Sequence, residues 1–154
     1  MVNVKNVDFH VIEDPRGKMI PIEYPKQLEF PLKRIYYIYD VGEKERRGFH
    51  SHNDLEQILI ATSGSVKIFV KTPYEEEVIE LNDPSKGLYI GPMIWREMFD
   101  FSSDAVLLVL ASHEYDESDY IRNYEEYEET AKKYFKEMKW WRLILLDLTL
   151  CIMN

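Results

Sequence analysis

The chain has 154 residues, of which 45% are hydrophobic and 31% charged, a composition typical of one globular domain. Its formal net charge of -9 disfavours a nucleic-acid or anionic-membrane partner, because phosphate-rich surfaces are bound through basic patches. The single cysteine, Cys151, cannot form an intrachain disulfide, and the N-terminus lacks the apolar core of a signal peptide. We therefore expect a cytoplasmic protein that does not span a membrane.

Short apolar and aromatic runs separated by turn signals extend from residue 7 to about residue 112. The first run, VDFHVIE, leads into DPRG, a turn with proline second and glycine fourth. The later runs are KRIYYIYDV, GFHSH, EQILIATSG, SVKIFVK, EEVIELN, KGLYIGP, IWREMFDF and AVLLVLAS. Many short strands with no helical period between them predict an all-β antiparallel sandwich or barrel.

The pattern changes after HEYDESDYIRN. Apolar and aromatic residues then recur at three- and four-residue spacing, at Tyr120, Tyr124, Tyr127, Ala131, Tyr134, Phe135 and Met138. This spacing predicts an amphipathic helix packed across the barrel, with Asp116, Ser118 or Asp119 as its N-cap.

The last stretch, KWWRLILLDLTLCIMN, differs from the rest of the chain because it has an apolar run and no turn signals. Its apolar run is too short to span a bilayer, which takes about 20 residues. Three alternatives stay open: it continues the helix, packs on a partner subunit, or is a non-native extension. We expect a domain over residues 1–138 and a tail of unknown role over residues 139–154.

His50 and His52, in the run RRGFHSH, make up half of the histidines of the chain. On a strand they point to the same face, with their Cα atoms roughly 6.5–7 Å apart. One alternative is that both rings simply face solvent or pack in the core. Another is metal binding, since metal-binding cupins place a glutamate where Glu56 stands. The later run, however, offers Arg96 and Glu97 where a further histidine ligand would lie.

A cation such as Arg96 aimed into the cavity would repel a divalent metal and favour an anion or a carbonyl oxygen. We therefore expect no metal cofactor. Proton transfer remains, because neutral and protonated imidazole are both accessible near neutral pH. Two such rings on one face can remove a proton from one carbon and deliver it to a neighbour, as keto–enol chemistry requires.

Three segments carry a resemblance to a known family. They are RRGFHSHNDLEQILIATSGSVKI, LNDPSKGLYIGPMIWREMFDFSSDAVLLVLAS and YDESDYIRNYEE. They closely resemble the dTDP-sugar 3,4-ketoisomerases, cupin-superfamily enzymes often described as WxcM-like. DPRG and KRIYYIYDV match as well, so the likeness covers about residues 5–127 and leaves the tail outside. The resemblance implies a cupin-type antiparallel β-barrel (jelly roll) with a C-terminal helix.

The activity that the resemblance implies is metal-free isomerisation of dTDP-4-keto-6-deoxyglucose to its 3-keto isomer. The product would feed aminotransferases that make 3-amino-3,6-dideoxyhexoses. His50 and His52 then resemble the family's proton-transfer pair, although which ring is the base stays open. Tyr37 resembles a tyrosine that points into the site, with a core aromatic as the alternative reading.

Four further residues resemble the family's substrate contacts. Arg16, in the DPRG turn, and Arg96 would lie at the mouth around the sugar, where each could instead form a surface salt bridge. Arg47 would meet the diphosphate and Gln57 would orient a histidine. Trp95 is expected in the core.

The partners implied are a dTDP-linked keto-sugar and a second copy of the chain, as a homodimer with exchanged N-terminal strands. The rival functions are a sugar-nucleotide epimerase, a metal-dependent cupin enzyme and a non-catalytic sugar-nucleotide-binding cupin. The configuration of the product at C4 depends on the face that receives the proton, and the sequence does not reveal it.

Overall fold

The structure, a computed structural model, describes the backbone of residues 1–152 and the side chains of residues 1–138. Most of the strands belong to two five-stranded antiparallel sheets. The first has the order β1 (Val4–Asp8), β9 (Lys86–Ile90), β6 (Gln57–Ser63), β11 (Val106–Ala111) and β4 (Arg34–Tyr39). The second has the order β12 (Tyr120–Ile121), β5 (Arg47–His52), β10 (Trp95–Phe99), β7 (Val66–Lys71) and β8 (Glu76–Leu81). The chain also forms a hairpin of β2 (Ile12–Asp14) and β3 (Gly17–Met19), a 3-10 turn η1 (Glu117–Asp119) and helix α1 (Tyr124–Ile152).

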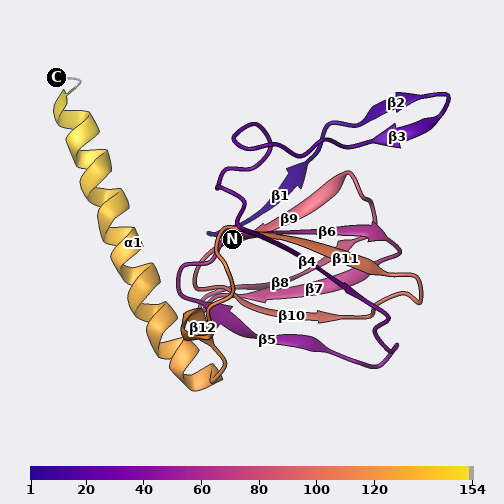
Figure 1. The fold of residues 1–154 in the computed structure, drawn as a ribbon. Helices are drawn as coiled ribbons and strands as arrows, with labels where there is room; N and C mark the ends of the chain where they lie inside the picture. Colours follow the sequence, from indigo (N-terminus) through magenta and orange to yellow (C-terminus); the bar gives the residue numbers. More distant parts are fainter. Residues whose placement is uncertain (153–154) are drawn as a thin grey trace.

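The two large sheets pack face to face, and their inner faces form the main apolar core (Figure 1). Strand β7 shows why one face of each sheet forms the core. Val66, Ile68 and Val70 are buried, whereas the residues between them are partly exposed. A strand with one face on a core has this two-residue period. The expected all-β jelly roll with a C-terminal helix is confirmed.

A second apolar cluster lies on the outer face of the first sheet. Phe9, Leu28 and Phe30 pack there against Ile58 and Ile60 of β6, whose neighbours along the strand belong to the main core. The segment between β3 and β4 therefore covers part of this outer face.

The first expected strand is divided in the structure. The run VDFHVIE spans the end of β1 and the start of β2, with a break over residues 9–11. The ladder between β1 and β9 ends at the pair Asp8–Lys86, and beyond it the backbone N–H of Phe9 donates to the carbonyl of Ser85 at 2.9 Å. The DPRG turn is confirmed, since β2 ends at Asp14 and β3 begins at Gly17. Figure 1 shows this hairpin standing away from the barrel.

Helix α1 begins at Tyr124, later than the aromatic spacing suggested. Its N-cap is Asn123, whose Oδ1 accepts the backbone N–H of Glu126 at 2.9 Å. The caps expected from the sequence are wrong, because that segment forms η1 and β12. Asp116 caps η1 instead, where its side chain accepts the backbone N–H of Ser118.

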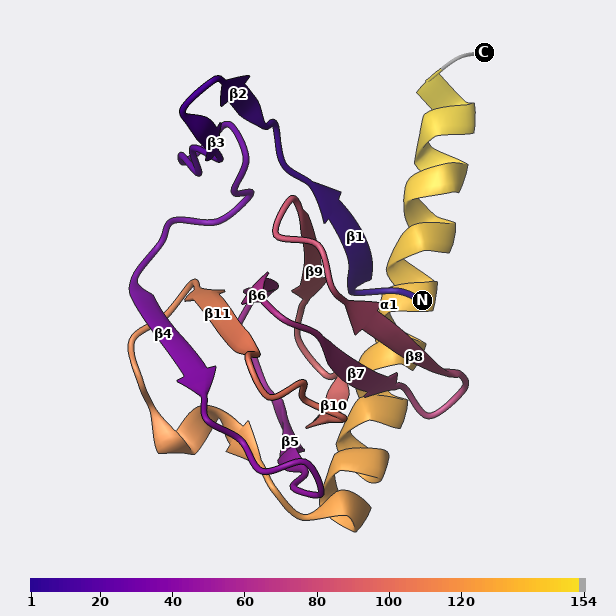
Figure 2. The same cartoon turned by 90° about the vertical axis from the view of Figure 1, so that its right-hand side faces the viewer.

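One face of α1 packs against an end of the barrel, as Figures 1 and 2 show together. Tyr127, Ala131 and Phe135 are buried there, which confirms the amphipathic spacing. The Tyr127 ring lies 5.3 Å from Trp95, and its hydroxyl donates to the carbonyl of Lys71 at 2.6 Å. Trp95 is 5% exposed and belongs to the core, as expected.

The backbone of residues 139–152 continues α1, which is the first of the three alternatives for the tail. The side chains of the tail, and with them any contact to a partner, lie outside the described residues. No helix within the described part of the chain is long and apolar enough to cross a membrane.

Candidate active site

A distortion of β5 precedes the two histidines. Gly48 has φ +97° and Phe49 has φ 54°, and the register between β5 and β10 shifts between Arg96 and Glu97. A Cβ on Gly48 would lie 2.7 Å from the carbonyl oxygen of Arg96, so the two backbones approach this closely only with glycine. The glycine of RRGFHSH is therefore needed for the bulge that leads into His50.

His50 and His52 converge as the strand alternation predicts. Their ring centroids lie 4.8 Å apart in an edge-on arrangement. Tyr120, from β12, packs against both, at 5.0 Å from His50 and 4.2 Å from His52. His52 is completely buried, whereas His50 is partly exposed and lines a cavity of about 400 Å³.

Each imidazole has one nitrogen committed to an acceptor. The Nδ1 of His50 lies 2.9 Å from the carbonyl oxygen of Gly48, and the Nδ1 of His52 lies 2.8 Å from Oδ2 of Asp119. A carbonyl or carboxylate oxygen can only accept, so both Nδ1 atoms carry the proton in the neutral rings. Both Nε2 atoms are then left bare, in the form in which a base takes up a proton.

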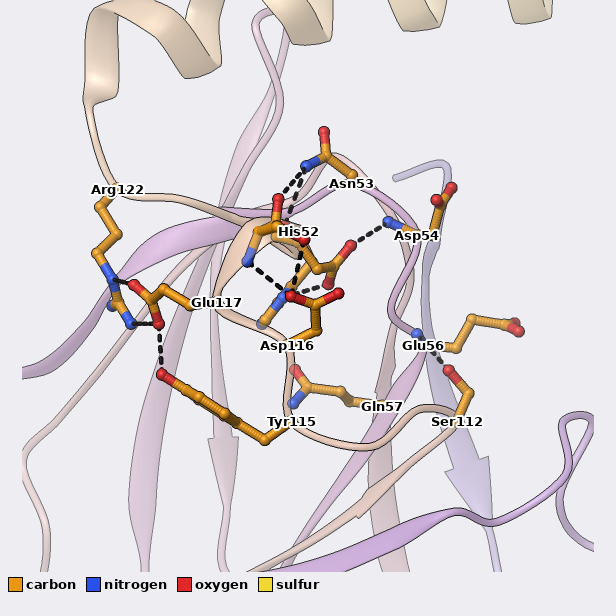
Figure 3. A network of polar contacts seen from close by, with 12 residues as sticks. His52, Asn53, Asp54, Glu56, Gln57, Ser112, Tyr115, Asp116, Glu117 and Arg122 are labelled. Carbon is orange, nitrogen blue, oxygen red and sulfur yellow. Dashed lines mark hydrogen bonds and ion pairs between the residues drawn. The ribbon is translucent and has the colours of Figure 1, made fainter.

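Asp119, the last residue of η1 before β12, contacts His52 on the neighbouring strand β5. Figure 3 shows the polar network on this side of His52. The carboxylate also accepts the backbone N–H of Asp54 at 2.8 Å, and the carbonyl of Asp119 accepts that of Asn53 at 2.9 Å. Sequence reasoning considered Asp119 only as a helix cap and missed this contact. Its position in the YDESDYIR segment of the family resemblance was the available signal.

Arg96 lies inside the barrel, in register with His50 on the neighbouring strand. It is 1% exposed, and none of its three guanidinium nitrogens has a hydrogen-bond partner among the described residues. The expected position at the mouth is therefore wrong, and so is a surface salt bridge. A buried cation without a partner is unfavourable, so the site is suited to an anion or a polarised oxygen from outside the chain.

Burial lowers the pKa of Arg96 and of both histidines. Burial lowers the pKa of Arg96 to about 10. Burial first, and the charge of Arg96 second, lower the pKa of His50 to about 3 and shift the pKa of His52 downward as well. Both rings are consequently neutral at physiological pH and available as bases.

The cavity beside His50 has basic walls. Arg47, which the sequence predicted to meet the diphosphate, lines it together with Arg34 and Arg122, which sequence reasoning missed. The diphosphate contact stays a prediction. None of the described residues that line this cavity is acidic, although the chain has a net charge of -9. Arg122 is held in place by an ion pair with Glu117, which lies outside the lining. The local charge favours an anionic ligand.

Of the two neighbouring tyrosines on β4, Tyr36 lines this cavity, and the assignment of Tyr37 to the interior is wrong. Tyr37 lies on the outer face of β4 and is 63% exposed. The Tyr36 hydroxyl accepts a hydrogen bond from Nε2 of Gln57 at 2.9 Å, and burial raises the pKa of Tyr36. Gln57 is 3% exposed and bonds this tyrosine, whereas the sequence predicted a bond to a histidine.

Arg16 is not brought to the histidines within one chain. It lies at the tip of the β2–β3 hairpin, with 90% of its side chain exposed and an ion pair to Asp14. Figure 1 places this hairpin on the far side of the first sheet from β5.

Glu56, the glutamate at the position used by metal-binding cupins, is bound elsewhere. Its Oε1 accepts the hydroxyl of Tyr89 at 2.6 Å. Among the side chains that the structure describes, no three of His, Cys, Asp or Glu lie together as a metal site. The absence of a metal cofactor stays a prediction.

The family model described as FdtA, WxcM-like, C-terminal matches residues 2–132. The chain belongs to this family. It is 45% identical to the TDP-4-oxo-6-deoxy-alpha-D-glucose-3,4-oxoisomerase of Aneurinibacillus thermoaerophilus. The match extends over 129 residues, which are 84% of this chain and 93% of the relative.

Solved structures of sugar 3,4-ketoisomerases also match. QdtA, a sugar 3,4-ketoisomerase from Thermoanaerobacterium thermosaccharolyticum in complex with TDP, is 56% identical with a TM-score of 0.86, over 88% of this chain and 98% of that one. A histidine-to-asparagine mutant of QdtA in complex with TDP-4-keto-6-deoxyglucose is 55% identical with a TM-score of 0.85, over 86% and 96%. These similarities also support the cupin-type barrel expected from the sequence.

Proposed function

We propose that this protein is a dTDP-4-keto-6-deoxyglucose 3,4-ketoisomerase. It moves the keto group of the hexose from C4 to C3, and the product supplies an aminotransferase that makes dTDP-3-amino-3,6-dideoxyhexoses. The observation that carries the proposal is the pair His50 and His52, two neutral imidazoles in contact beside a cavity with arginine walls. The name of the curated relative, at 45% identity, and the TDP-4-keto-6-deoxyglucose bound to the QdtA mutant, at 55% identity, support the same substrate.

The reaction needs a base, an acid and a stabilised oxyanion. The C4 ketone acidifies the C3–H bond, and one histidine removes that proton to give an enediolate with a C3–C4 double bond. A proton is returned to C4, the C3 hydroxyl loses its proton as C3 becomes the ketone, and the C4 oxygen gains one. The rings of His50 and His52 are close enough to serve neighbouring carbons.

Arg96 would balance the negative charge that develops during this reaction. Its guanidinium is buried and has no partner among the described residues, so it is already desolvated and oriented. The cavity arginines Arg34, Arg47 and Arg122 are suited to the diphosphate, since guanidinium groups bind phosphate oxygens in a fixed fork geometry.

NMR of purified protein with dTDP-4-keto-6-deoxyglucose labelled with ¹³C at C3 and C4 tests the activity directly. The carbonyl resonance should disappear from C4 and appear at C3. Protein that binds the sugar nucleotide and leaves the carbonyl at C4 would contradict the proposal and favour the non-catalytic binding protein. The cytoplasmic location stays a prediction, tested by cell fractionation.

The pH dependence follows from the depressed pKa of the histidines. A base must be neutral, and an unperturbed histidine would lose activity below pH of about 6.5. Because the pKa of His50 is lowered to about 3, we expect kcat/KM to stay level from about pH 8 to about pH 5. The unfolded chain takes up these protons at higher pH than the folded chain does, so stability should fall as the pH drops below about 6.5. A sigmoidal loss of kcat/KM between pH 6 and pH 7 would contradict this assignment.

Metal removal should not affect turnover. The cationic Arg96 lies next to the histidines, where a divalent ion would be repelled. We expect purified protein to lack stoichiometric metal by elemental analysis and to keep its activity in strong chelator. Activity that is lost in EDTA and returns with iron, zinc or manganese would favour the metal-dependent cupin enzyme.

We also propose a symmetric homodimer with exchanged N-terminal strands. The hairpin that projects from the barrel exposes Ile12 and Met19, and the edge strand β4 exposes Ile35, Tyr37 and Tyr39. Unpaired edges and clustered exposed apolar side chains are typical of interfaces. Exchange would carry Arg16 of each chain to the other chain's site.

Light scattering at micromolar concentration should give the mass of two chains, and a monomeric mass would contradict the proposal. Mixed dimers test the exchange. Co-expressed Arg16→Ala and His50→Asn chains should be more active together than either alone, because each mixed dimer contains one site with both residues intact. Mixed dimers no more active than the parents would place Arg16 outside the site.

A further inference from the structure

The carboxylate of Asp119 is held by two different donors, one on each oxygen. Oδ2 lies 2.8 Å from Nδ1 of His52, and Oδ1 accepts the backbone N–H of Asp54 at 2.8 Å. The backbone carbonyl of Asp119 accepts the N–H of Asn53 at 2.9 Å. With three contacts fixing this residue, the carboxylate cannot turn away from His52 without breaking a bond.

The far nitrogen of His52 has the opposite character. The side chain is 0% exposed, and Nε2 has no hydrogen-bond partner among the described residues. A buried acceptor without a partner is unfavourable, and native structures rarely leave one without a functional reason. This orphaned atom points to a ligand proton as its partner.

The two histidines differ in what holds them. His50 donates to the neutral carbonyl of Gly48, whereas His52 donates to a carboxylate. A carboxylate stabilises an imidazolium that forms transiently on the same ring, and a carbonyl does so much less. The charge of Arg96 opposes that imidazolium, so a compensating anion is needed on the other side.

We propose that Asp119 is a positioning residue for the isomerisation, which keeps His52 in the tautomer with a bare Nε2 and stabilises the ring when it is protonated. The inference rests on the proposed function. During turnover the substrate proton binds to Nε2 and later leaves from it. The Nδ1 proton stays on His52 throughout, so no proton passes to Asp119.

Asp119→Asn tests this arrangement with almost no change in shape. The amide oxygen must still accept the N–H of Asp54, so the amide NH₂ group faces Nδ1 of His52. His52 is then forced to carry its proton on Nε2, where it cannot act as a base. We expect kcat to fall by roughly 10²-fold or more, with KM for dTDP-4-keto-6-deoxyglucose changed by at most about threefold.

Asp116→Asn is the matched control. Asp116 lies in the same loop and caps η1 through the backbone N–H of Ser118, a role that asparagine performs equally well. Turnover of this variant should stay near that of the wild type. Asp119→Glu keeps an acceptor-only group and should retain more turnover than Asp119→Asn.

A ¹⁵N–¹H NMR spectrum of the imidazole nitrogens reads the tautomer without any catalysis. Wild-type His52 should carry its proton on Nδ1, and in Asp119→Asn it should carry it on Nε2. The proposal is overturned if Asp119→Asn turns over within threefold of wild type, or if its turnover falls while the tautomer stays the same.

If Asp119→Asn fails to fold, the wild-type spectrum alone decides, since a proton on Nε2 of His52 contradicts the proposal. A wild-type protein that shows the Nδ1 tautomer and no isomerisation would instead remove the proposed function and leave the Asp119–His52 pairing intact.

Discussion

Replacing His52 with asparagine should reduce kcat by roughly 10²-fold or more, with a modest change in KM. Asparagine keeps much of the shape of the ring and some hydrogen bonding, but it cannot take up a proton. A base that acts only in the transition state contributes little to ligand affinity. Steady-state kinetics on dTDP-4-keto-6-deoxyglucose separate the two effects. A variant whose KM rises while kcat holds would show that the ring only binds.

His50→Asn should behave similarly, and the double mutant tests whether the pair acts as a unit. The ring centroids are 4.8 Å apart and both rings pack on Tyr120. Groups that work together in one step have non-additive effects, so the double mutant should lose less than the product of the single losses. Single variants with near wild-type turnover would exclude both rings from the mechanism and make Tyr36 the next candidate.

Replacing Arg96 with methionine should make the protein more stable and less active. The guanidinium is 1% exposed and has no partner among the described residues, so the folded state contains an uncompensated buried charge. Apolar replacement of buried ionic groups is often stabilising, by about 1–4 kcal/mol. Loss of a preorganised donor for the enediolate should lower kcat by about 10²–10³-fold.

Thermal unfolding and steady-state kinetics on the same sample measure both effects. The control is Arg46→Met, which removes an exposed arginine that pairs with Glu97 and does not line the cavity. It should leave kcat unchanged. An Arg96→Met variant with a lowered Tm would show that the guanidinium has a stabilising partner in the protein, and unchanged kcat would exclude it from the reaction.

The histidine pair could be predicted because one strand supplies it. The alternation of β5 alone places His50 and His52 on one face. The phase of β4 could not be predicted in the same way. KRIYYIYDV has apolar or aromatic residues on both faces, so its pattern does not distinguish Tyr36 from Tyr37. A shift of one residue exchanges the two faces of a strand, and that shift is the error made for Tyr37.

Asp119 and Arg16 illustrate two further reasons why parts of the site could not be predicted from the sequence. Asp119 meets His52 over a separation of 67 residues, and only the pairing of β12 with β5 brings them together. Its local surroundings in the sequence resembled a helix cap. For Arg16 the turn was predicted correctly, but within one chain the β2–β3 hairpin holds it away from the histidines. Its place in the proposed dimer stays a prediction.

The arginine-lined cavity lies within a molecule whose net charge is -9, and this contrast affects the approach of ligands. At distances beyond a Debye length of about 8 Å in physiological salt, the two fields are largely screened. At shorter distances, a long polyanion such as RNA would place only a few phosphates near the cavity arginines. Its many other phosphates would lie against the acidic exterior and be repelled. A short diphosphate can place its whole charge inside the basic cavity. The distribution of charge therefore selects anions by length as well as by sign, before any contact with the base or the sugar.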